Sequence, residues 1–245
     1  MIANLMMYQR KQLVGEHNRY WALIRNYLSD ENIDSPEVLA QDAEEFAVWN
    51  DPDLVLSQTC GMPYRTWLHD KVSLVGTPDF GVVGCEPGYY RSAIIVRADD
   101  ERTELKLFSD ATFAYNQDFS QSGYAAPYWH VNPQGFWFEN RLHTEQHLIS
   151  AQAVAEGRAD IASLDAVSWR LMEEYEDFTQ KLRVLEWTKP TPGLPYIAAK
   201  SANVDATFTA VEKAIASLSD EDRNKLGIRG IVQIPKQVYL TIQNP

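Results

Sequence analysis

One short segment of the sequence, residues 119–124, carries the residue types that bind an oxyanion. The hydroxyls of Ser120 and Ser122 flank Gln121, and Gly123 lets the backbone approach a ligand closely. The segment lies between an expected strand and an expected helix, so the N–H groups of the helix start point to the same place. The pattern predicts an oxyanion cradle; the alternative is a plain helix-capping loop, since serine is common at caps.

The histidines raise a second kind of chemistry, a metal site. His143 and His147 are four residues apart, with Glu145 between them and His130 upstream. The acid is third in this five-residue run, whereas zinc-dependent proteases carry it second, and His143 precedes the expected helix start. We therefore expect capping and surface histidines, with no metal and no cofactor.

The two cysteines, Cys60 and Cys85, leave two arrangements open. A disulfide between them would close a loop of about 25 residues and add roughly 3 kcal/mol to stability. The alternative is a pair of buried thiols. A nucleophilic role for Cys60 is not favoured, because the spacing implies no partner histidine.

Composition and charge exclude several classes of partner. The 245 residues are 45% hydrophobic and 23% charged, as is typical of a folded globular protein. The net charge is −12 and no run of Lys and Arg occurs, so nucleic acid and anionic membranes are not expected as partners. The apolar runs are far shorter than the roughly 20 residues of a spanning helix, so no membrane insertion is expected.

The first residues do not form an export signal as written. The apolar start is short and interrupted by Asn4, and the basic residues Arg10 and Lys11 come after it. This segment instead predicts a first buried strand. We expect a periplasmic protein if a leader has been removed ahead of Met1, and a cytoplasmic one if the chain is complete as written.

Strand-like and helix-like runs alternate along the chain, which predicts an α/β protein with largely parallel sheets. Strands are expected at residues 53–57, 72–75, 91–97, 111–116, 160–164, 182–188 and 237–242. Helices are expected at residues 20–28, from Ser35 onward, near Pro127, and at 144–156, 167–177 and 204–218. Gly157 is the expected stop of the fourth of these helices, and Ser219 the cap of a final turn.

Two features suggest that the chain forms two lobes. The long β run before Asp99 and the proline-rich return after Thr188 are interpreted as crossings between them. Lobe 1 is then residues 1–95 plus 189–245, and lobe 2 is residues 96–188. A cleft between two such lobes is a natural ligand site.

Several segments, in order, resemble one known family. The run Ser120-Gln121-Ser122-Gly123-Tyr124 is similar to the Ser-x-Ser-Gly loop of the phosphate/phosphite/phosphonate substrate-binding proteins of ABC transporters. The resemblance extends over about residues 1–200. Its further segments are residues 5–8, 56–63, 84–85, 90–92, 147–150 and 155–160, followed by Asp165.

The resemblance implies a type II periplasmic-binding-protein fold, in which two α/β lobes close on a ligand, and no catalysis. It places Tyr8, Gln58 and Thr59 on the first lobe's side of the cleft. From the second lobe, Ser120, Gln121, Ser122 and Gly123 would hold the ligand's oxygens, and Tyr124 would belong to the same ligand-binding site. His147, in the first turn of its helix, would donate a further hydrogen bond. Asp165, at the carboxyl end of a strand, would face the cleft.

The sequence also departs from the family pattern. Glu145 and Gln146 stand where the family often has Gly-Ser or Gly-Gly, Phe108-Ser109-Asp110 where Leu-Arg-Gly is common, and Gln121 where phosphonate binders often have Thr. Because a carboxylate repels a bound dianion, Asp165 would favour a protonated oxyanion or a ligand with a positive amine. Its alternative role is a helix cap for the residues from Val167 onward.

We therefore expect a monomeric solute-binding protein for a small anionic ligand, most plausibly a phosphonate or phosphite-like compound, presented to an ABC permease. Two alternatives stay open on the same fold. One is a cytoplasmic ligand sensor or orphan binding protein. The other is an enzyme resembling a pyrimidine-precursor synthase, which we favour less.

Overall fold

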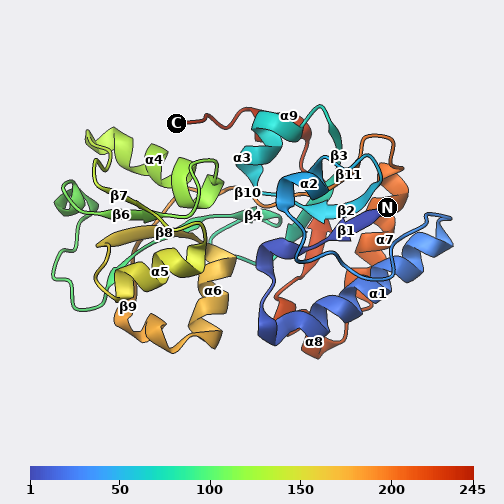
Figure 1. Ribbon diagram of the computed structural model, residues 1–245, viewed down its shortest axis with the longest axis horizontal. Helices are drawn as coiled ribbons and strands as arrows, with labels where there is room; N and C mark the ends of the chain where they lie inside the picture. Colours follow the sequence, from blue (N-terminus) through green and yellow to red (C-terminus); the bar gives the residue numbers. More distant parts are fainter. The chain divides into compact units, whose positions relative to one another are not determined.

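The computed structural model describes all residues 1–245, and its chain divides into two α/β units (Figure 1). Unit 1 comprises Met1–Tyr89 and Pro192–Ile242, and unit 2 comprises Tyr90–Thr191 and Gln243–Pro245. The strand β5 (Ser92–Arg97), which a boundary at residue 95 would divide, lies wholly in unit 2. The chain also enters unit 2 a second time at Gln243, which the sequence did not indicate.

Unit 1 is built on a five-stranded sheet in the order β1-β2-β11-β3-β12. Only β1 and β2 pair in parallel; β11 runs antiparallel to β2 and β3, and β12 antiparallel to β3. The expectation of a mostly parallel sheet is therefore wrong for this unit, because the returning C-terminal strands run against the others. The strands are β1 (Ile2–Asn4), β2 (Leu54–Gln58), β3 (Val72–Asp79), β11 (Tyr196–Ala199) and β12 (Gly230–Val232).

Helices cover both faces of this sheet (Figure 1). One face packs on α1 (Val14–Asp30), α7 (Val204–Ala216) and α8 (Asp220–Leu226). The other face packs on α2 (Glu45–Trp49), on α3 (Gly61–Pro63) with the π-helical turn η3 (Tyr64–Leu68), and on α9 (Lys236–Leu240). Short 3₁₀ turns at Met6–Tyr8 and Lys11–Leu13 lead into α1.

The helix expected from Ser35 onward does not form. This segment lies extended beside α1, where the indole Nε1 of Trp21 donates to the Pro36 carbonyl at 3.2 Å. Ala40 N–H donates to the Ala3 carbonyl at 2.8 Å. These bonds use the backbone groups that a helix would pair internally, and the next helix, α2, begins only at Glu45.

Unit 2 has a second five-stranded sheet, in the order β7-β6-β8-β5-β9. Here β6 is parallel to β7 and β8, whereas β5 is antiparallel to β8 and β9. This sheet is also mixed rather than mostly parallel, because β5, which carries the chain into the unit, runs against its neighbours β8 and β9. The other strands are β6 (Phe113–Tyr115), β7 (Arg141–His143), β8 (Ile161–Asp165) and β9 (Leu182–Trp187).

The helices of unit 2 again lie on both faces of the sheet. The helices α5 (His147–Ala155) and α6 (Ala166–Tyr175) pack on one face, and α4 (Ala126–Val131) packs on the other. The π-helical turn η5 (Gln121–Ala125) leads directly into α4. Shorter turns are η4 (Leu105–Phe108), η6 (Asn132–Gln134) and η7 (Asp177–Lys181).

The helix expected at residues 144–156 begins three residues later, at His147. Glu145 has a φ of +66°, in the left-handed region that L side chains rarely adopt. Gln146 N–H donates to the Thr144 carbonyl at 2.7 Å and closes a tight turn before the helix. Glycine would adopt the backbone of residue 145 without strain, which explains why a glycine is common at this position in the family that the sequence resembles.

The end of the chain also differs from expectation. Residues 237–242 are not a strand, because Pro235 starts the helix α9 and the completely buried ring of Tyr239 anchors it in the core. A short apolar run of this kind has no periodicity that separates strand from helix. The short strands β4 (Tyr89–Tyr90) and β10 (Thr191–Pro192) pair where the chain passes between the units.

No disulfide joins Cys60 and Cys85, so the possible bridge is not formed. Cys60 is the cap residue of α3, and its carbonyl accepts from the N–H of Tyr64, the first residue of η3, at 3.1 Å. Cys85 closes a separate turn by donating to the Val82 carbonyl at 3.1 Å. The backbone of each half-buried cysteine is thus part of a separate local turn. No helix in the chain is long and apolar enough to cross a membrane.

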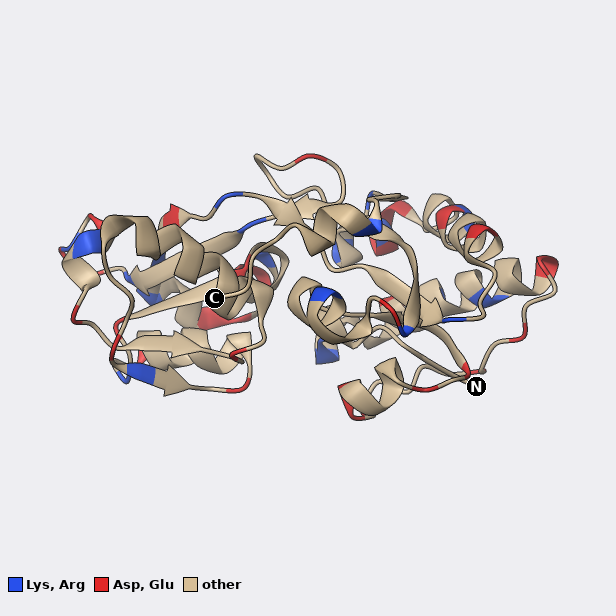
Figure 2. Ribbon diagram, turned by 90° about the horizontal axis from the view of Figure 1, so that it is seen from above, with Lys and Arg blue, Asp and Glu red and all other residues tan.

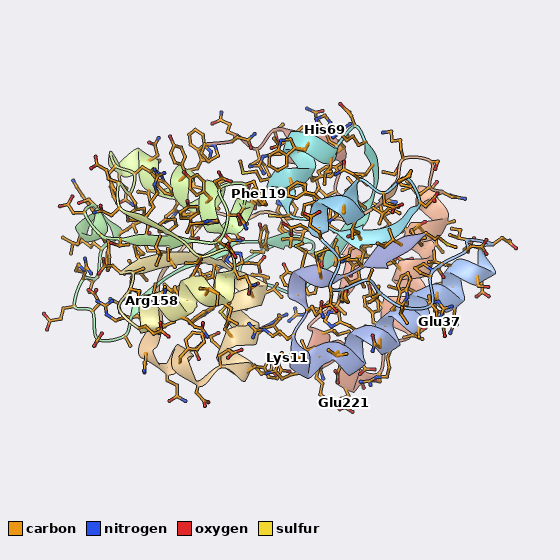
Figure 3. The ribbon with its side chains drawn as sticks, viewed as in Figure 1. Lys11, Glu37, His69, Phe119, Arg158 and Glu221 are labelled. Atoms are coloured by element: carbon orange, nitrogen blue, oxygen red, sulfur yellow. The ribbon has the colours of Figure 1, made fainter.

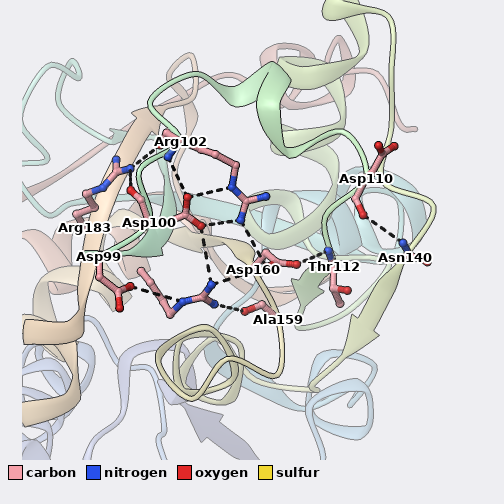
Figure 4. A network of polar contacts seen from close by, with 10 residues as sticks. Asp99, Asp100, Arg102, Asp110, Thr112, Asn140, Ala159, Asp160 and Arg183 are labelled. Atoms are coloured by element: carbon pink, nitrogen blue, oxygen red, sulfur yellow. Dashed lines mark hydrogen bonds and ion pairs between the residues drawn. The ribbon is translucent and has the colours of Figure 1, made fainter.

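A network of charged side chains lies at the edge of the unit 2 sheet where β5 ends and β8 begins (Figure 4). Arg102 binds Asp100 through two side-chain hydrogen bonds of 2.9 and 2.6 Å, which lower the pKa of Asp100 to about 2. Arg183 donates to the Asp100 carbonyl at 2.9 Å. Figure 2 shows such acidic and basic segments interspersed in both units.

Candidate functional site

The hydroxyl-rich loop of unit 2 forms a capped helix start. Ser120 is the cap of η5, and its Oγ accepts a hydrogen bond from Gly123 N–H at 3.0 Å. The Ser120 carbonyl accepts from Ala125 N–H at 3.0 Å, which makes this first turn π-helical. Figure 3 labels Phe119, which leads into the loop. The capping alternative is therefore correct in structural terms, but the Ser120 hydroxyl proton is not used by the cap.

Ser122 is held at both ends by neighbouring elements. Its Oγ lies 3.0 Å from Nε2 of His147, the first residue of α5. Its carbonyl accepts from Ser163 Oγ of β8 at 2.7 Å. Side chains 120, 121 and 122 are all buried. The orientation of Ser122 is thus fixed before any ligand arrives.

Gly123 cannot be replaced without moving its surroundings. A Cβ built on this residue would overlap Oδ1 of Asn116 and lie 3.2 Å from Cε1 of His147. Asn116 follows directly on β6, and its Oδ1 is buried without a hydrogen-bond partner. The loop therefore packs tightly on the Asn116 amide and the His147 ring, which requires glycine at this position.

The His147 ring is neutral in this environment. Burial lowers the pKa of His147 to about 4, and the backbone of Ser163 only partly offsets this shift. The ring is therefore uncharged at neutral pH. It contributes hydrogen bonding to the site and no positive charge.

Asp165 lies at the carboxyl end of β8, the strand whose Ser163 holds the loop, and caps α6. Its Oδ1 accepts from Val167 N–H at 2.7 Å and from Ser168 N–H at 3.1 Å. The side chain is buried. This is the structural alternative that the sequence left open for Asp165, and a role toward a ligand stays a prediction.

Tyr124 follows the loop, but its side chain lies among aromatic rings. The ring contacts Tyr115 and Trp137, with centroids 5.3 and 5.5 Å away. Its hydroxyl accepts from Arg141 at 2.9 Å. Through these contacts the side chain of Tyr124 anchors the end of the loop to neighbouring residues of unit 2.

Unit 1 contributes the other predicted ligand residues. Gln58, at the end of β2, donates its side-chain amide to the Leu194 carbonyl at 3.1 Å. Thr59 is completely buried, and its Oγ1 lies 3.4 Å from the Cys60 carbonyl. The ring of Tyr8 packs edge-on against Phe80, with centroids 4.8 Å apart. All three lie near the start of helices that follow β1 or β2.

The structure thus brings Ser120, Gln121, Ser122, Gly123 and His147 together in unit 2, and Gln58 and Thr59 in unit 1. Sequence reasoning missed Asn116 and Ser163, which support the loop. Asn116 had one usable signal, a polar residue directly after a buried strand. Ser163 had none, because a serine inside a strand is ordinary.

The histidines considered for a metal have other neighbours. His143 Nε2 lies 3.2 Å from Gln117 Oε1 and its ring stacks on Tyr115. His130 pairs with Glu186 at 2.7 Å. No group of three or more His, Cys, Asp or Glu side chains is arranged to hold a metal ion.

Comparison with known proteins gives a family and a fold. Residues 76–237 match the model of a family described as ABC transporter, phosphonate, periplasmic substrate-binding protein. No curated protein sequence matches the chain.

Solved structures resemble the chain over nearly its whole length. A binding-protein component of an ABC phosphonate transporter from Pseudomonas aeruginosa (PA3383) has a TM-score of 0.71 at 15% identity, covering 99% of this chain and 83% of that one. PhnD1 from Prochlorococcus marinus, in complex with methylphosphonate, has a TM-score of 0.70 at 13% identity, with 98% and 94% covered. XAC2383 from Xanthomonas citri, bound to ATP, has a TM-score of 0.69 at 14% identity, with 97% and 91% covered. At these identities the likeness shows a shared two-lobed fold.

Proposed function

The chain belongs to the phosphonate periplasmic substrate-binding proteins of ABC transporters, and we propose that it captures a small phosphonate or phosphite-like oxyanion for uptake. This is a family of solute-binding proteins that serve transport rather than catalysis. The identity of the ligand is the part that the family leaves open.

The observation that carries the proposal is the arrangement of Ser120 and Ser122. Each hydroxyl oxygen already has a partner nitrogen within its own unit, Gly123 N at 3.0 Å and His147 Nε2 at 3.0 Å. The Ser120 hydroxyl accepts from Gly123 N–H and therefore still has its own proton to give. Two hydroxyls, two residues apart on one tight turn, match the oxygens of a tetrahedral anion.

Electrostatics favour the same class of ligand. His147 is neutral and Asp165 is engaged as a helix cap, so the loop binds through neutral donors rather than through ion pairs. Hydrogen bonds from neutral groups to a charged oxygen are stronger than those between neutral partners. Because the whole chain carries a net charge of −12, its overall charge does not attract an anion, and the proposed binding depends on the hydrogen-bond donors of the loop.

The residues of unit 1 complete the proposed site. Tyr8, Gln58 and Thr59 would approach the ligand when the two units close on it, as the resemblance to the family implies. Gln121 takes the place of the family's frequent hydroxyl and would offer an amide donor instead. An aminoalkyl ligand would in addition place its amine toward Asp165.

The ligand class can be tested by thermal unfolding in a panel of compounds. The panel is phosphite, phosphate, methylphosphonate, 2-aminoethylphosphonate, sulfate, taurine and thiamine. Methylphosphonate is included because PhnD1 of Prochlorococcus marinus was solved with it. A ligand at 100 times its Kd adds about 2.7 kcal/mol to folding stability. For a chain of this size we expect a rise in Tm of roughly 5–10 °C.

We expect the rise to be confined to phosphite and the phosphonates. A larger rise for 2-aminoethylphosphonate than for methylphosphonate, lost in Asp165→Asn, would support the proposed place of the amine. No shift with any phosphorus oxyanion would overturn the proposed ligand class while leaving the fold assignment intact.

The description of the family also supports a proposal for the partner protein and for the cellular compartment. We propose that the ligand-bound form is presented to an ABC permease and that it acts in the periplasm. Pull-down of a candidate permease by the protein with and without ligand tests the first point. Binding that does not depend on the ligand would contradict it.

A further inference from the structure

We propose that Arg91, stacked on Trp187, forms a second subsite in unit 2 that binds a carboxylate of the ligand. The proposed function supplies a phosphonate held by the loop of residues 120–123. This inference rests on that function and narrows its substrate class to phosphonocarboxylates, which carry a phosphonate at one end and a carboxylate at the other.

Arg91 lies at the same edge of the unit 2 sheet as the loop of residues 120–123. It directly precedes β5, whose first residue, Ser92, lies opposite Asp165 at the carboxyl end of β8. The loop follows the carboxyl end of β6, the neighbour of β8 on its other side. One strand therefore separates Arg91 from the strand that leads into the loop. Because neighbouring strands lie about 4.8 Å apart, β6 and β5 are separated by about 10 Å.

The guanidinium of Arg91 has an aromatic neighbour but no anionic one. Its central carbon lies 4.4 Å from the centroid of the Trp187 ring, at the end of β9. Its Nε is buried without an acceptor, and no side-chain hydrogen bond or ion pair joins Arg91 to the rest of the chain. Asp165, which caps α6, does not pair with it. A half-buried positive charge is thus left without a counter-charge at the edge that carries the loop.

A second stacked arginine in unit 2 shows how the fold treats an arginine that serves structure. Arg102 lies over the ring of Phe108, 3.9 Å from its centroid, at the opposite edge of the sheet (Figure 4). It donates to Asp100 in two hydrogen bonds of 2.9 and 2.6 Å and lies 3.5 Å from a carboxylate oxygen of Asp160. The charge of Arg102 is balanced within the unit, whereas that of Arg91 remains available to an anion from outside.

The stacked geometry favours a carboxylate as that anion. Stacking on Trp187 covers one face of the planar guanidinium and leaves the N–H groups in its plane as donors. Two parallel N–H groups of this fork match the two oxygens of a carboxylate, and such paired, charge-assisted bonds are among the strongest in proteins. A ligand held by its phosphonate at the loop would therefore gain affinity from a carboxylate that reaches Arg91.

Isothermal calorimetry at pH 7 can compare each phosphonocarboxylate with the alkylphosphonate of equal carbon number. The pairs are phosphonoacetate with ethylphosphonate, 3-phosphonopropionate with propylphosphonate, and 4-phosphonobutyrate with butylphosphonate. We expect the carboxylate to improve affinity about tenfold or more in the longer pairs. The gain should be smallest for phosphonoacetate, because β6 and β5 lie about 10 Å apart. Equal affinities within every pair would overturn the inference and leave the proposed function intact.

Arg91→Met separates recognition of the carboxylate from support of the fold. Methionine keeps an unbranched chain beside Trp187, so a structural defect would weaken both members of a pair alike. We expect instead that the ratio of the two affinities falls toward one. Arg91→Lys keeps the charge without the planar fork and should retain part of the ratio; it replaces Arg91→Met if that variant does not fold. Equal losses for both ligands would overturn the inference.

Arg158→Met is the matched control for net charge. Arg158 is exposed, pairs with Glu156 at 2.8 Å and precedes β8 at the opposite edge of the sheet. Its removal takes away the same charge, and we expect the ratio of affinities to stay as in the original protein. A fall in this ratio equal to that in Arg91→Met would show a general charge effect and would overturn the inference. If the unaltered protein binds neither series, the proposed function fails and this inference fails with it.

Discussion

In both units a strand leads into a helix that carries residues of the proposed site, but the two helix starts are built differently. In unit 1, β2 leads through Thr59 and Cys60 into α3, and the cap residue Cys60 makes no side-chain hydrogen bond to the helix. In unit 2, β6 leads to Ser120, whose hydroxyl caps η5. Both helices contain a π-helical turn, but only in unit 2 does it stand at the very start.

We propose that this difference places the selectivity of the site in unit 2. In unit 2 both hydroxyls are oriented by fixed nitrogens, and Ser163 holds the loop backbone. In unit 1 the Gln58 amide is used to bind the Leu194 carbonyl, and Thr59 has only a long 3.4 Å contact with Cys60. Unit 2 is therefore the preorganised half of the proposed site, and we propose that unit 1 adds contacts when a ligand binds.

The largest effect is expected from Gly123→Ala. The new methyl group would overlap Asn116 Oδ1 and displace the loop, with a loss of stability of about 1–3 kcal/mol and loss of detectable methylphosphonate binding. Calorimetry and urea unfolding measure both. Gly230→Ala is the control, since a Cβ there meets nothing within 4 Å. Relief of the defect by a second change, Asn116→Ala, would confirm the cause; an unimpaired Gly123→Ala would refute the tight packing.

Removal of hydroxyls comes next in size and compares the units directly. A hydrogen bond to a charged group is worth about 1.5–3 kcal/mol, so Ser120→Ala and Ser122→Ala should each weaken affinity about 10- to 100-fold. Thr59→Val should weaken it only a few-fold. Isothermal calorimetry with methylphosphonate gives the three values. If Thr59→Val costs more than either serine change, the preorganised half has been assigned to the wrong unit.

Acid sensitivity is a smaller effect with a defined sign. The folded-state pKa of His147, about 4, lies below the ordinary value of 6.5, so the unfolded state takes up a proton first as pH falls. Stability should therefore decline between pH 6.5 and 4. His147→Gln should flatten this decline in part, because burial also lowers the pKa of His17 in unit 1. Urea unfolding at pH 7 and 4.5 checks it; an unchanged slope would contradict the buried, neutral ring.

A second acid step belongs to the charged network of unit 2. Hydrogen bonds from Arg102 lower the folded-state pKa of Asp100 to about 2, from an ordinary 3.8. Its contribution is present above pH 3.8 and is lost as pH falls toward 2. Arg102→Met should lower the stability at pH 7. The further loss of stability between pH 3.8 and 2 should then be smaller than in the original protein. Equal losses in both proteins between pH 4 and 2 would argue against the ion pair.

The smallest effect expected is a gain. Glu145→Gly should raise stability by about 0.5–1 kcal/mol, because glycine relieves the left-handed backbone, less the entropy that glycine adds to the unfolded chain. Asn32→Gly is the matched control in unit 1, since asparagine tolerates its φ of +58°. Chemical unfolding compares the two. A loss of stability in Glu145→Gly would show that the side chain holds the turn.

Much of the fold was predictable from the sequence, because the apolar residues that recur along its helices and strands are the ones that are buried in the structure. The strand before Gln58, the helix closed by Gly157 and the helix capped by Asn203 all follow local rules. Strand direction was not predictable, because the antiparallel strands β11 and β12 pair with segments more than a hundred residues away in sequence.

The candidate site divides in the same way. The Ser120 loop was evident from residue types, whereas the bonds of Ser122 to His147 and Ser163 join residues 25 and 41 positions apart. Tyr124 was expected among the ligand-binding residues; its ring contacts Trp137, and its role toward a ligand stays a prediction. Which way a side chain turns depends on tertiary packing, which a local motif does not encode.

The central claim, that the unit 2 loop is the preorganised anion site, is tested most directly by amide chemical shifts. Methylphosphonate is titrated into ¹⁵N-labelled protein, and the shifts of residues 120–123 are compared with those of Gln58 and Thr59. We predict the largest downfield shifts in the Ser120–Gly123 turn. Saturable binding that leaves those four amides unmoved, while Gln58 or Thr59 shifts, would contradict the account.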